Sequence, residues 1–208
     1  NCPLCPRLVA YREENRAAYP DWHNGPVHSI GRLEAELLIL GLAPGVKGAN
    51  RTGKPFTGDY GGQLLYSTLL KFKFAIGILG KLPGDEVKLI NCRIANAVRC
   101  VPPQNKPTGQ EIKACAPFLE QEIVSMSNLK VVLALGTIAH NSVLSLFNLQ
   151  RNAWKFGHNI QHDLGSGFVL VNSYHCSRYN TNTGRLTEEM FHDVFRTIRR
   201  LMCPKKIR

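Results

Sequence analysis

Four cysteines are spaced so that their thiols could share a metal site. Cys2 and Cys5 form a CxxC pair, which can bind one metal centre but supplies only half of a tetrahedral site. Cys100 and Cys115 are the best candidates for a second pair, because one follows an apparent strand and the other lies near the start of an expected helix. Thiolates from separated positions suit an iron–sulfur cluster better than a zinc ribbon, in which both halves are usually CxxC. The alternative is that these cysteines are buried as small hydrophobic side chains.

The total of seven cysteines is odd, and no secretory signal accompanies them. Both features argue against a disulfide framework. We interpret Cys92, Cys176 and Cys203 as ordinary thiols.

A glycine-rich stretch follows the first apolar run and could bring the backbone close to a ligand. Its glycines are Gly41, Gly45, Gly48, Gly53, Gly58, Gly61 and Gly62. The patterns GxxxxGK[ST] and GxGxxG are absent, so nucleoside triphosphates and dinucleotides are disfavoured as ligands. Within the stretch, Phe56 could stack on a flat ring.

Three polar residues of this chain could take part in catalysis, and each also has a structural interpretation. Asp59 is the only carboxylate between Glu36 and Asp85, and is either a turn residue or a catalytic acid. Asn96 could pair with a base edge or satisfy loop backbone. His175 could donate a hydrogen bond to an oxygen that gains charge, or could be a packed structural histidine.

Four short apolar runs predict the strands that position these residues. They span residues 35–42, 87–98, 129–135 and 168–174, and helical or loop-rich stretches separate them. This pattern predicts an α/β fold with three layers, in which helices cover both faces of a central, mainly parallel, four-stranded sheet. Three of the runs end in loops that contain the candidate residues: the glycine-rich stretch with Asp59, the loop that begins at Asn96 and the loop that begins at His175. Since ligands of such sheets bind at the carboxyl ends of the strands, the loops should converge on one site.

Length and composition indicate one soluble domain over residues 1–208. The chain is 44% hydrophobic and 20% charged, and it has no apolar stretch of about 18 to 20 residues that could span a membrane. It begins at Asn1 without a charged-then-apolar signal stretch, so we expect a protein that is not secreted. The formal net charge of +11 favours a polyanionic partner, with nucleic acid first.

Two long motifs resemble those of the uracil-DNA glycosylase superfamily, and within it most closely the iron–sulfur family 5, type b, enzymes. The motifs are GLAPG with GANRTGKPFTGD at residues 41–45 and 48–59, and HCSRYNTNTGRLT at residues 175–187. Between them, NAVRCVPP at residues 96–103 is similar to the central block of the family, and CPLC at residues 2–5 to its opening. The resemblance covers nearly the whole chain.

The resemblance implies a 4Fe-4S cluster, because Cys2, Cys5, Cys100 and Cys115 match the four ligands of the family. It assigns Gly41, Ala43, Gly45 and Phe56 to the substrate pocket, with Phe56 as the stacking ring. Asn96 matches the base-reading amide, Asp59 the acid that helps water or the oxocarbenium ion, and His175 the histidine near the leaving base.

Some residues depart from the family pattern. Where the best-known uracil glycosylases have a water-orienting acid and an aromatic wall, this chain has Ala43 and Gly45. Family 4 has Glu where this chain has Leu42, and Cys176 stands where a proline is expected. We therefore expect Asp59 to replace the missing acid, a roomier pocket and a less rigid second loop.

The implied function is monofunctional hydrolysis of the N-glycosidic bond of uracil in DNA, and of other deaminated bases such as hypoxanthine, to initiate base excision repair. Arg178 and Tyr179 are expected to enter the duplex, while Arg51, Lys54 and Arg185 hold phosphates. We expect a cytoplasmic, nucleoid-associated monomer that acts on double-stranded DNA, with single-stranded DNA as a second candidate.

Two other functions are compatible with the same residues. The chain could be an iron–sulfur DNA-binding protein of the same fold that is catalytically weak or inactive, and the missing motif acid is the best support for this alternative. An electron-transfer protein is disfavoured, because nothing in the sequence resembles a partner or flavin site.

Overall fold

The computed structural model describes residues 2–80 and 87–203. Residues 1, 81–86 and 204–208, which belong to the expected domain 1–208, lie outside the described residues. No helix in the described ranges is long and apolar enough to cross a membrane.

The central sheet has five strands in the order β4-β1-β5-β7-β6. The strands span Leu37–Gly41 (β1), Cys92–Asn96 (β4), Val131–Leu135 (β5), Gln161–Asp163 (β6) and Val169–Ser173 (β7). The first four in the order pair in parallel, and each comes from one of the four apolar runs. The prediction of an α/β fold with a mainly parallel sheet is confirmed.

The predicted number of four strands is wrong, because β6 adds a fifth at the edge. It pairs antiparallel with β7, and its sequence Gln-His-Asp carries no apolar pattern from which a strand could be predicted. The side chains of β6 are exposed or only partly buried, so this strand needs no apolar pattern.

The run at residues 87–98 forms two strands rather than one. Asn91 has a left-handed backbone, with φ of +51°, and its side chain accepts a hydrogen bond from the Glu36 amide at 2.9 Å. Before this break, β3 (Val87–Leu89) pairs with β2 (Ala75–Gly77) in a separate hairpin. After it, β4 enters the main sheet.

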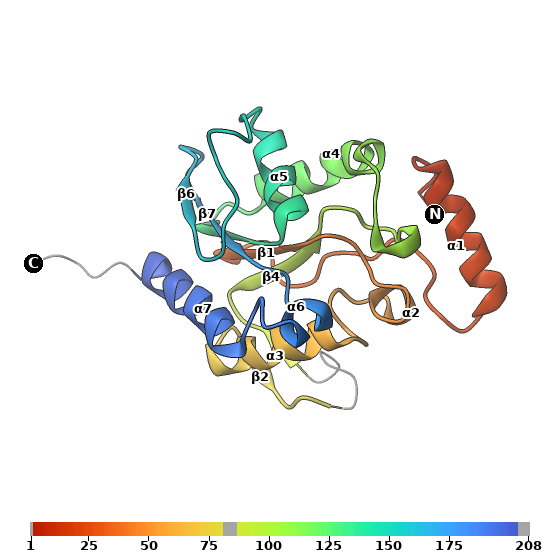
Figure 1. Cartoon of the computed structure of the whole chain (residues 1–208), viewed down its shortest axis with the longest axis horizontal. Coiled ribbons are helices and arrows are strands. Elements are labelled where there is room, and N and C mark those ends of the chain that lie inside the picture. The colour runs from red at the N-terminus through yellow and green to blue at the C-terminus, as the bar shows by residue number, and fades with distance from the viewer. Residues whose placement is uncertain (1, 81–86, 204–208) are drawn as a thin grey trace, which may run out of the picture.

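Helices cover both faces of the sheet, as the three-layer prediction requires (Figure 1). α3 (Tyr60–Lys71) and α7 (Glu188–Met202) pack on one face, and α4 (Gly109–Ser125) and α5 (Thr137–Leu146) on the other. α1 (Pro6–Ala18) lies at one end of the molecule. The loops contain α2 (Ala49–Thr52), a 3₁₀ turn at Pro103–Asn105 and α6 (Arg178–Asn182).

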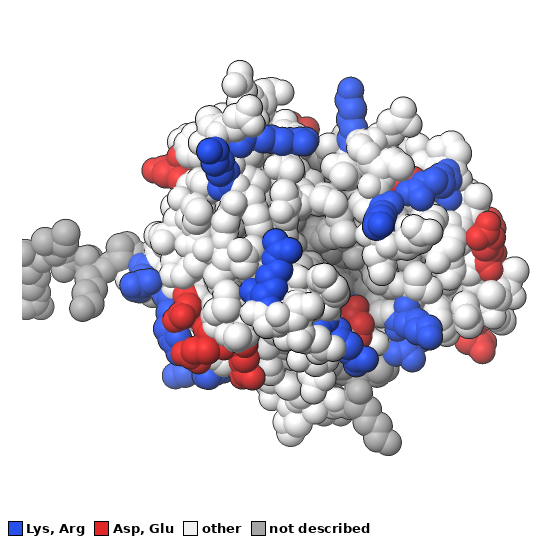
Figure 2. All heavy atoms as spheres, viewed as in Figure 1, with Lys and Arg blue, Asp and Glu red and all other residues white. Residues whose placement is uncertain are grey.

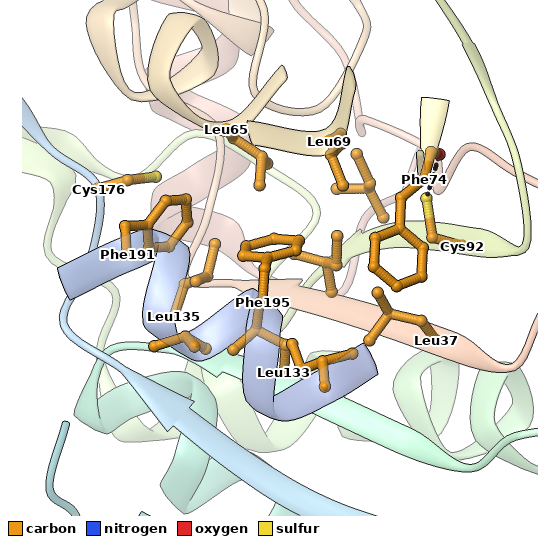
Figure 3. Packing of buried hydrophobic residues seen from close by; sticks show 14 of the residues in the cluster. Leu37, Leu65, Leu69, Phe74, Cys92, Leu133, Leu135, Cys176, Phe191 and Phe195 are labelled. Carbon is orange, nitrogen blue, oxygen red and sulfur yellow. Dashed lines mark hydrogen bonds between the residues drawn. The ribbon is translucent and has the colours of Figure 1, made fainter. Parts of the chain in front are cut away.

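Alternation along the strands sorts the core into two layers. In β1, Leu37 and Ile39 face α3 and α7, whereas Leu38 and Leu40 face the opposite layer, and all four are fully buried. Figure 3 shows the first layer, in which Phe191 and Phe195 of α7 point toward Leu65 and Leu69 of α3. This packing fixes the position of α3, whose first turn lies at the site.

The parallel strands end side by side and therefore bring their following loops together. Gly41 pairs with Asn96 across β1 and β4, and Leu135 pairs with Ser173 across β5 and β7. The glycine-rich stretch follows β1, the central block follows β4 and the His175 loop follows β7. The two long motifs therefore meet at the carboxyl edge of the sheet.

Candidate active site

A pocket of about 590 Å³ lies at this edge and is lined by both motif loops. Its lining residues are Leu42, Ala43, Gly45, Lys47, Asp59, Tyr60, Gly61, Asn105, His175, Ser177 and Arg178. Of the expected substrate and catalytic residues, Ala43, Gly45, Asp59 and His175 line the pocket directly. Gly41, Phe56 and Asn96 are outside this lining, immediately beside it.

Gly41 lets two of these residues approach the end of β1. A Cβ atom there would lie closer than van der Waals contact to Asn96 Oδ1 and 2.5 Å from Phe56 Cζ, so the absence of a side chain at Gly41 permits this close approach. The Phe56 ring in turn lies beside His175, with ring centroids 5.9 Å apart and ring planes 24° apart. Asn96 and Phe56 therefore meet at Gly41, and His175 lies beside the Phe56 ring, as the convergence of the loops predicts.

Phe56 also has an unusual backbone, with φ of +54°. A bulky side chain seldom adopts this left-handed conformation, which costs energy that the surrounding structure must supply. Tyr66 contributes to that support, because its hydroxyl donates to the Pro55 carbonyl at 3.1 Å.

Asp59 combines the two roles that the sequence left open. Its Oδ1 accepts a hydrogen bond from the Gly62 amide at 3.0 Å and caps the N-terminus of α3. Its Oδ2 faces the glycine loop: a Cβ atom would lie 2.5 Å from this oxygen at Gly48 and 3.3 Å from it at Gly45. Asp59 is an exposed residue of the pocket lining, so a ligand in the pocket could contact its side chain.

His175 contributes a neutral imidazole to the pocket. Burial lowers its pKa from the ordinary value of 6.5, while the charge of Asp59 acts in the opposite direction. Its Nδ1 is buried and has no hydrogen-bond partner among the described residues. The ring can therefore hold a proton on one nitrogen and donate it in a hydrogen bond to a ligand.

Two contacts hold the loop that carries His175. The Asn180 side chain donates to the His175 carbonyl at 2.8 Å. Cys176 is fully buried, and its thiol donates to the Gly61 carbonyl at 3.4 Å, which ties this loop to the first turn of α3. Cys176 thus supplies an anchor at the place where the resemblance suggested a loss of rigidity.

The expected DNA-contacting residues differ in their surroundings. Arg178 lines the pocket and its guanidinium lies over the Tyr60 ring, 5.5 Å from the centroid. Tyr179, the next residue, is 73% exposed. Arg185 lies over the Tyr174 ring at 4.7 Å. Figure 2 shows lysine and arginine side chains around the hollow of this face; acidic side chains cluster over α7, and a few others lie beside the hollow and at the edges of the view.

Arg51 and Lys54 lie in the glycine-rich stretch. Lys54 is exposed, whereas Arg51 is partly buried and its Nε has no hydrogen-bond partner among the described residues. Part of the Arg51 guanidinium lies against the loop near Gly58.

Six pocket residues were not among the expected site residues: Leu42, Lys47, Tyr60, Gly61, Asn105 and Ser177. Five of them, all except Asn105, stand inside or close to the two motifs, so their sequence positions could have indicated them. Asn105 lies in the loop between Cys100 and Cys115, and its left-handed φ of +56° is of a kind that asparagine tolerates.

The four predicted metal ligands come together at one end of the molecule. Cys5, the N-cap residue of α1, packs with Cys100, Cys115 and Leu8 in a small cluster. The pKa of Cys100 is raised to about 11, first by burial and then by the charges of Cys115, Cys2 and Cys5, while the charge of Arg12 acts in the opposite direction. The four thiols therefore lie within electrostatic range of one another.

No group of three or more His, Cys, Asp or Glu side chains in the described ranges is arranged to hold a single metal ion. An iron–sulfur cluster makes a different demand, because each cysteine binds a different iron atom and the thiols can lie further apart. The mutual electrostatic effects of the four thiols fit such a cluster, as do the burial of Cys100 and Cys115 and the partial burial of Cys2 and Cys5.

The other three cysteines lie elsewhere. Cys92 and Cys176 are buried, and burial raises the pKa of each to about 12. The Cys92 thiol donates to the Phe74 carbonyl, and Cys203 is exposed.

Comparison with known proteins adds to this geometry. Residues 28–199 match the sequence profile of the uracil DNA glycosylase superfamily. The chain is 46% identical to the type-5 uracil-DNA glycosylase of Thermus thermophilus over 209 residues, covering 96% of this chain and 93% of the relative. It is 39% identical to the type-5 enzyme of Mycobacterium bovis over 208 residues, covering 96% and 78%. A type-4 uracil-DNA glycosylase of Pyrobaculum aerophilum is 32% identical over 158 residues, covering 76% and 65%.

Proposed function

The chain belongs to the uracil-DNA glycosylase superfamily, and on this premise we propose that it hydrolyses the bond between uracil and deoxyribose in DNA, the first step of base excision repair. The observation that carries the proposal is the pocket at the carboxyl edge of the sheet, where the Asp59 carboxylate and the neutral ring of His175 line one cavity. These groups suit a reaction that builds positive charge on a sugar and negative charge on a leaving base.

The target base must leave the helical stack before it can enter such a pocket. Extrusion costs about a few kcal/mol, and less from a mismatch, so we expect uracil opposite guanine to be preferred over uracil opposite adenine. The exposed Tyr179 and the adjacent Arg178 would fill the space in the duplex, and Arg51, Lys54 and Arg185 would bind phosphates. Double-stranded DNA is therefore the proposed partner, and single-stranded DNA is the second candidate. We also propose that the enzyme is a monomer and acts in the nucleoid.

Asp59 is proposed to align water and stabilise the positive charge on the sugar. The hydrogen bond from the Gly62 amide to Oδ1 holds the carboxylate in place. Oδ2 then lies on the side of the glycine loop, and the side chain need not rotate to act there. A positioned acid or base of this kind typically accelerates a reaction about 10²- to 10⁴-fold.

His175, Asn96 and Phe56 are proposed to handle the base. The neutral His175 ring would donate a hydrogen bond to the oxygen of the leaving base as it gains charge. The Asn96 amide would read the base edge, and the Phe56 ring, which lies beside both residues, would stack near it.

The activity can be tested with a duplex oligonucleotide that contains one uracil opposite guanine. We expect an abasic site, seen as strand cleavage only after treatment with alkali. Because Lys47 lines the pocket, borohydride trapping should be included, and we expect no covalent product from a hydrolytic enzyme. Binding of the duplex without any cleavage would instead favour the catalytically inactive DNA-binding protein.

We further propose that the pocket accepts hypoxanthine or another deaminated purine. Gly45 has no side chain where the strictest uracil enzymes have an aromatic wall, and this glycine lines the pocket. Removal of a wall changes which bases enter more than it changes the rate on uracil.

Cys2, Cys5, Cys100 and Cys115 are proposed to hold a 4Fe-4S cluster, which would tie the N-terminal segment to the loop after Asn96. The packing of Cys5 with the buried Cys100 and Cys115, and the electrostatic effect of Cys2 on Cys100, support the proposal. Protein prepared without air should contain iron and sulfide, and replacement of any of these cysteines by alanine should release the iron. Cys203→Ala is the matched control, and we expect it to retain the metal. Stoichiometric zinc without iron would contradict the proposal.

A further inference from the structure

One side of α1 faces the four thiols of Cys2, Cys5, Cys100 and Cys115, called the thiol group below. Cys5, Leu8 and Arg12 are three and four residues apart, so they lie on the same side of this helix. Leu8 is buried against Cys100 and Cys115, and Arg12, one turn further along, is also buried. A charged side chain thus occupies a position where a hydrophobic one is usual.

Arg12 is only 4% exposed and has little to compensate its charge. Its Nη1 donates to the Cys2 carbonyl at 3.3 Å, and its Nε is buried without a hydrogen-bond partner among the described residues. The nearest carboxylate is that of Glu13, 3.7 Å from Nε, but Glu13 is 55% exposed and pairs more closely with Arg16, at 2.8 Å. A buried charge is costly unless it is paired, so Arg12 needs a stronger counter-charge than Glu13 provides.

Two other arginines near the thiol group are paired in the expected way. Arg7 donates two hydrogen bonds of 2.7 Å to Glu111, whose side chain is 7% exposed. Arg99 pairs at 3.0 Å with Glu122, whose side chain is 6% exposed. Among the described residues, Arg12 differs from both in having no buried carboxylate. It lies close enough to Cys100 for its positive charge to act on that sulfur.

We propose that the missing counter-charge is the thiol group itself, and that Arg12 is the fixed cation that stabilises the cysteine-bound cluster. The inference rests on the proposed cluster. Four thiolates outweigh the positive charge of the iron–sulfur core, so the bound cluster is an anion that gains further negative charge when it is reduced. A buried cation beside it strengthens retention of the cluster and raises its reduction potential.

The test compares the unmodified chain with three variants, all purified without air. Arg12→Met removes the charge and keeps a long stem that fills the space, Arg12→Lys keeps the charge, and Glu13→Gln removes the exposed carboxylate beside Arg12. Iron and sulfide content, the chelator concentration that removes half the iron, and the midpoint potential from the visible absorbance are measured for each. Far-ultraviolet circular dichroism of the chelator-treated proteins checks that the variants fold, and Arg12→Gln replaces Arg12→Met if the latter does not.

For Arg12→Met we expect the half-removal concentration to fall about 10- to 100-fold, the range typical of residues that support metal ligands. The midpoint potential should become more negative. Arg12→Lys should recover most of both properties, and Glu13→Gln should leave both unchanged.

Three results would overturn the inference, and they can be told apart. Absence of iron from the unmodified protein would overturn the proposed cluster together with the role of Arg12. Unchanged retention and potential in Arg12→Met would leave the cluster intact and overturn the role of Arg12 alone. Equal losses in Arg12→Met and Arg12→Lys would show that the size or shape of Arg12, and not its charge, matters.

Discussion

Helix α3 begins at the pocket and continues into the core, and its two parts have different surroundings. At its start, Asp59 is exposed, with one oxygen capping the helix and the other facing the glycine loop. Further along, Leu65 and Leu69 are fully buried against the layer that contains Phe195 (Figure 3). Polar atoms of the pocket are left available for a ligand, whereas the core leaves no space for one. Substitutions at the two parts should therefore separate catalytic rate from stability.

The largest effect is expected at the pocket end, for Asp59→Asn. Asparagine is as good an N-cap residue as aspartate, so α3 should keep its cap while the carboxylate is lost. We expect the single-turnover rate on uracil-containing duplex to fall about 10²- to 10⁴-fold, with little change in DNA binding or in the melting temperature.

Asp59→Ala is the matched control for this prediction, because it removes the cap as well. It should lose about 1 kcal/mol of stability in addition to the rate. If Asp59→Asn retained the full rate, the structural role as a helix cap would be the only role left for this residue.

The reverse behaviour is expected at the core end, for Phe195→Ala. The Phe195 ring is fully buried and contacts Phe72, Phe74 and Phe191, with ring centroids 5.3 to 6.0 Å away. Removal of a buried phenyl ring costs about 3–5 kcal/mol of the free energy of unfolding, measurable by denaturant titration. At denaturant concentrations well below the midpoint of unfolding, the rate of uracil release by this variant should equal that of the unmodified protein. A rate loss as large as that of Asp59→Asn would show that core and pocket are not separable.

The core could be predicted from the sequence more completely than its edges. The runs that gave β1, β5 and β7 are apolar because both faces of these strands are buried, and this pattern is local in the sequence. β6 could not be predicted, because the sequence Gln-His-Asp forms a strand only by pairing with β7. The division of residues 87–98 depends on a left-handed residue, Asn91, and the local pattern indicated only a polar break.

The site was predictable where its residues belong to the two motifs, and less so where tertiary contacts define it. The sequence placed Asp59 and His175 at strand ends that must converge. It could not show that Asp59 uses one oxygen as a cap, or that Cys176 anchors its loop to Gly61. Arg12 gave no signal at all, because a single arginine in a polar helix usually faces water.

A smaller effect is expected from Gly45→Tyr, which tests the breadth of the pocket. The new ring should depress cleavage of hypoxanthine more than cleavage of uracil, since the larger base would meet it first. Gly45→Ala is the matched control, because it introduces the same Cβ atom 3.3 Å from Asp59 Oδ2 without the ring. The ratio of the two activities, measured in single-turnover assays, should change for tyrosine and not for alanine. Equal losses on both bases would show that Gly45 shapes the backbone of the loop and does not set the specificity. If the unmodified protein cleaved uracil alone, the proposed activity on hypoxanthine would be wrong.

The smallest effect concerns protonation behind the pocket, at His158. Its Nδ1 accepts a hydrogen bond from the backbone amide of Tyr174 at 3.2 Å, and its Nε2 lies 3.3 Å from the Met190 carbonyl. Burial lowers the pKa of His158 from the ordinary value of 6.5, whereas the Met190 carbonyl and the charge of Asp193 act in the opposite direction. Protonation of Nδ1 would remove the acceptor for Tyr174, the residue directly before His175.

The folded chain binds this proton less readily than the unfolded chain. As the pH falls through the region of 6.5, the unfolded state therefore carries more protons than the folded state. The free energy of unfolding should therefore decrease on acidification from about pH 7.5 to about pH 5.5. The pKa values of His162 and His175 are lowered as well, so they add to the same trend. His158→Gln keeps an acceptor but cannot titrate, and should flatten part of this dependence in thermal melts while leaving the pH profile of the uracil rate unchanged. A matching change in the rate profile would show that protonation at His158 reaches His175, and that the pocket and the layer behind it are coupled.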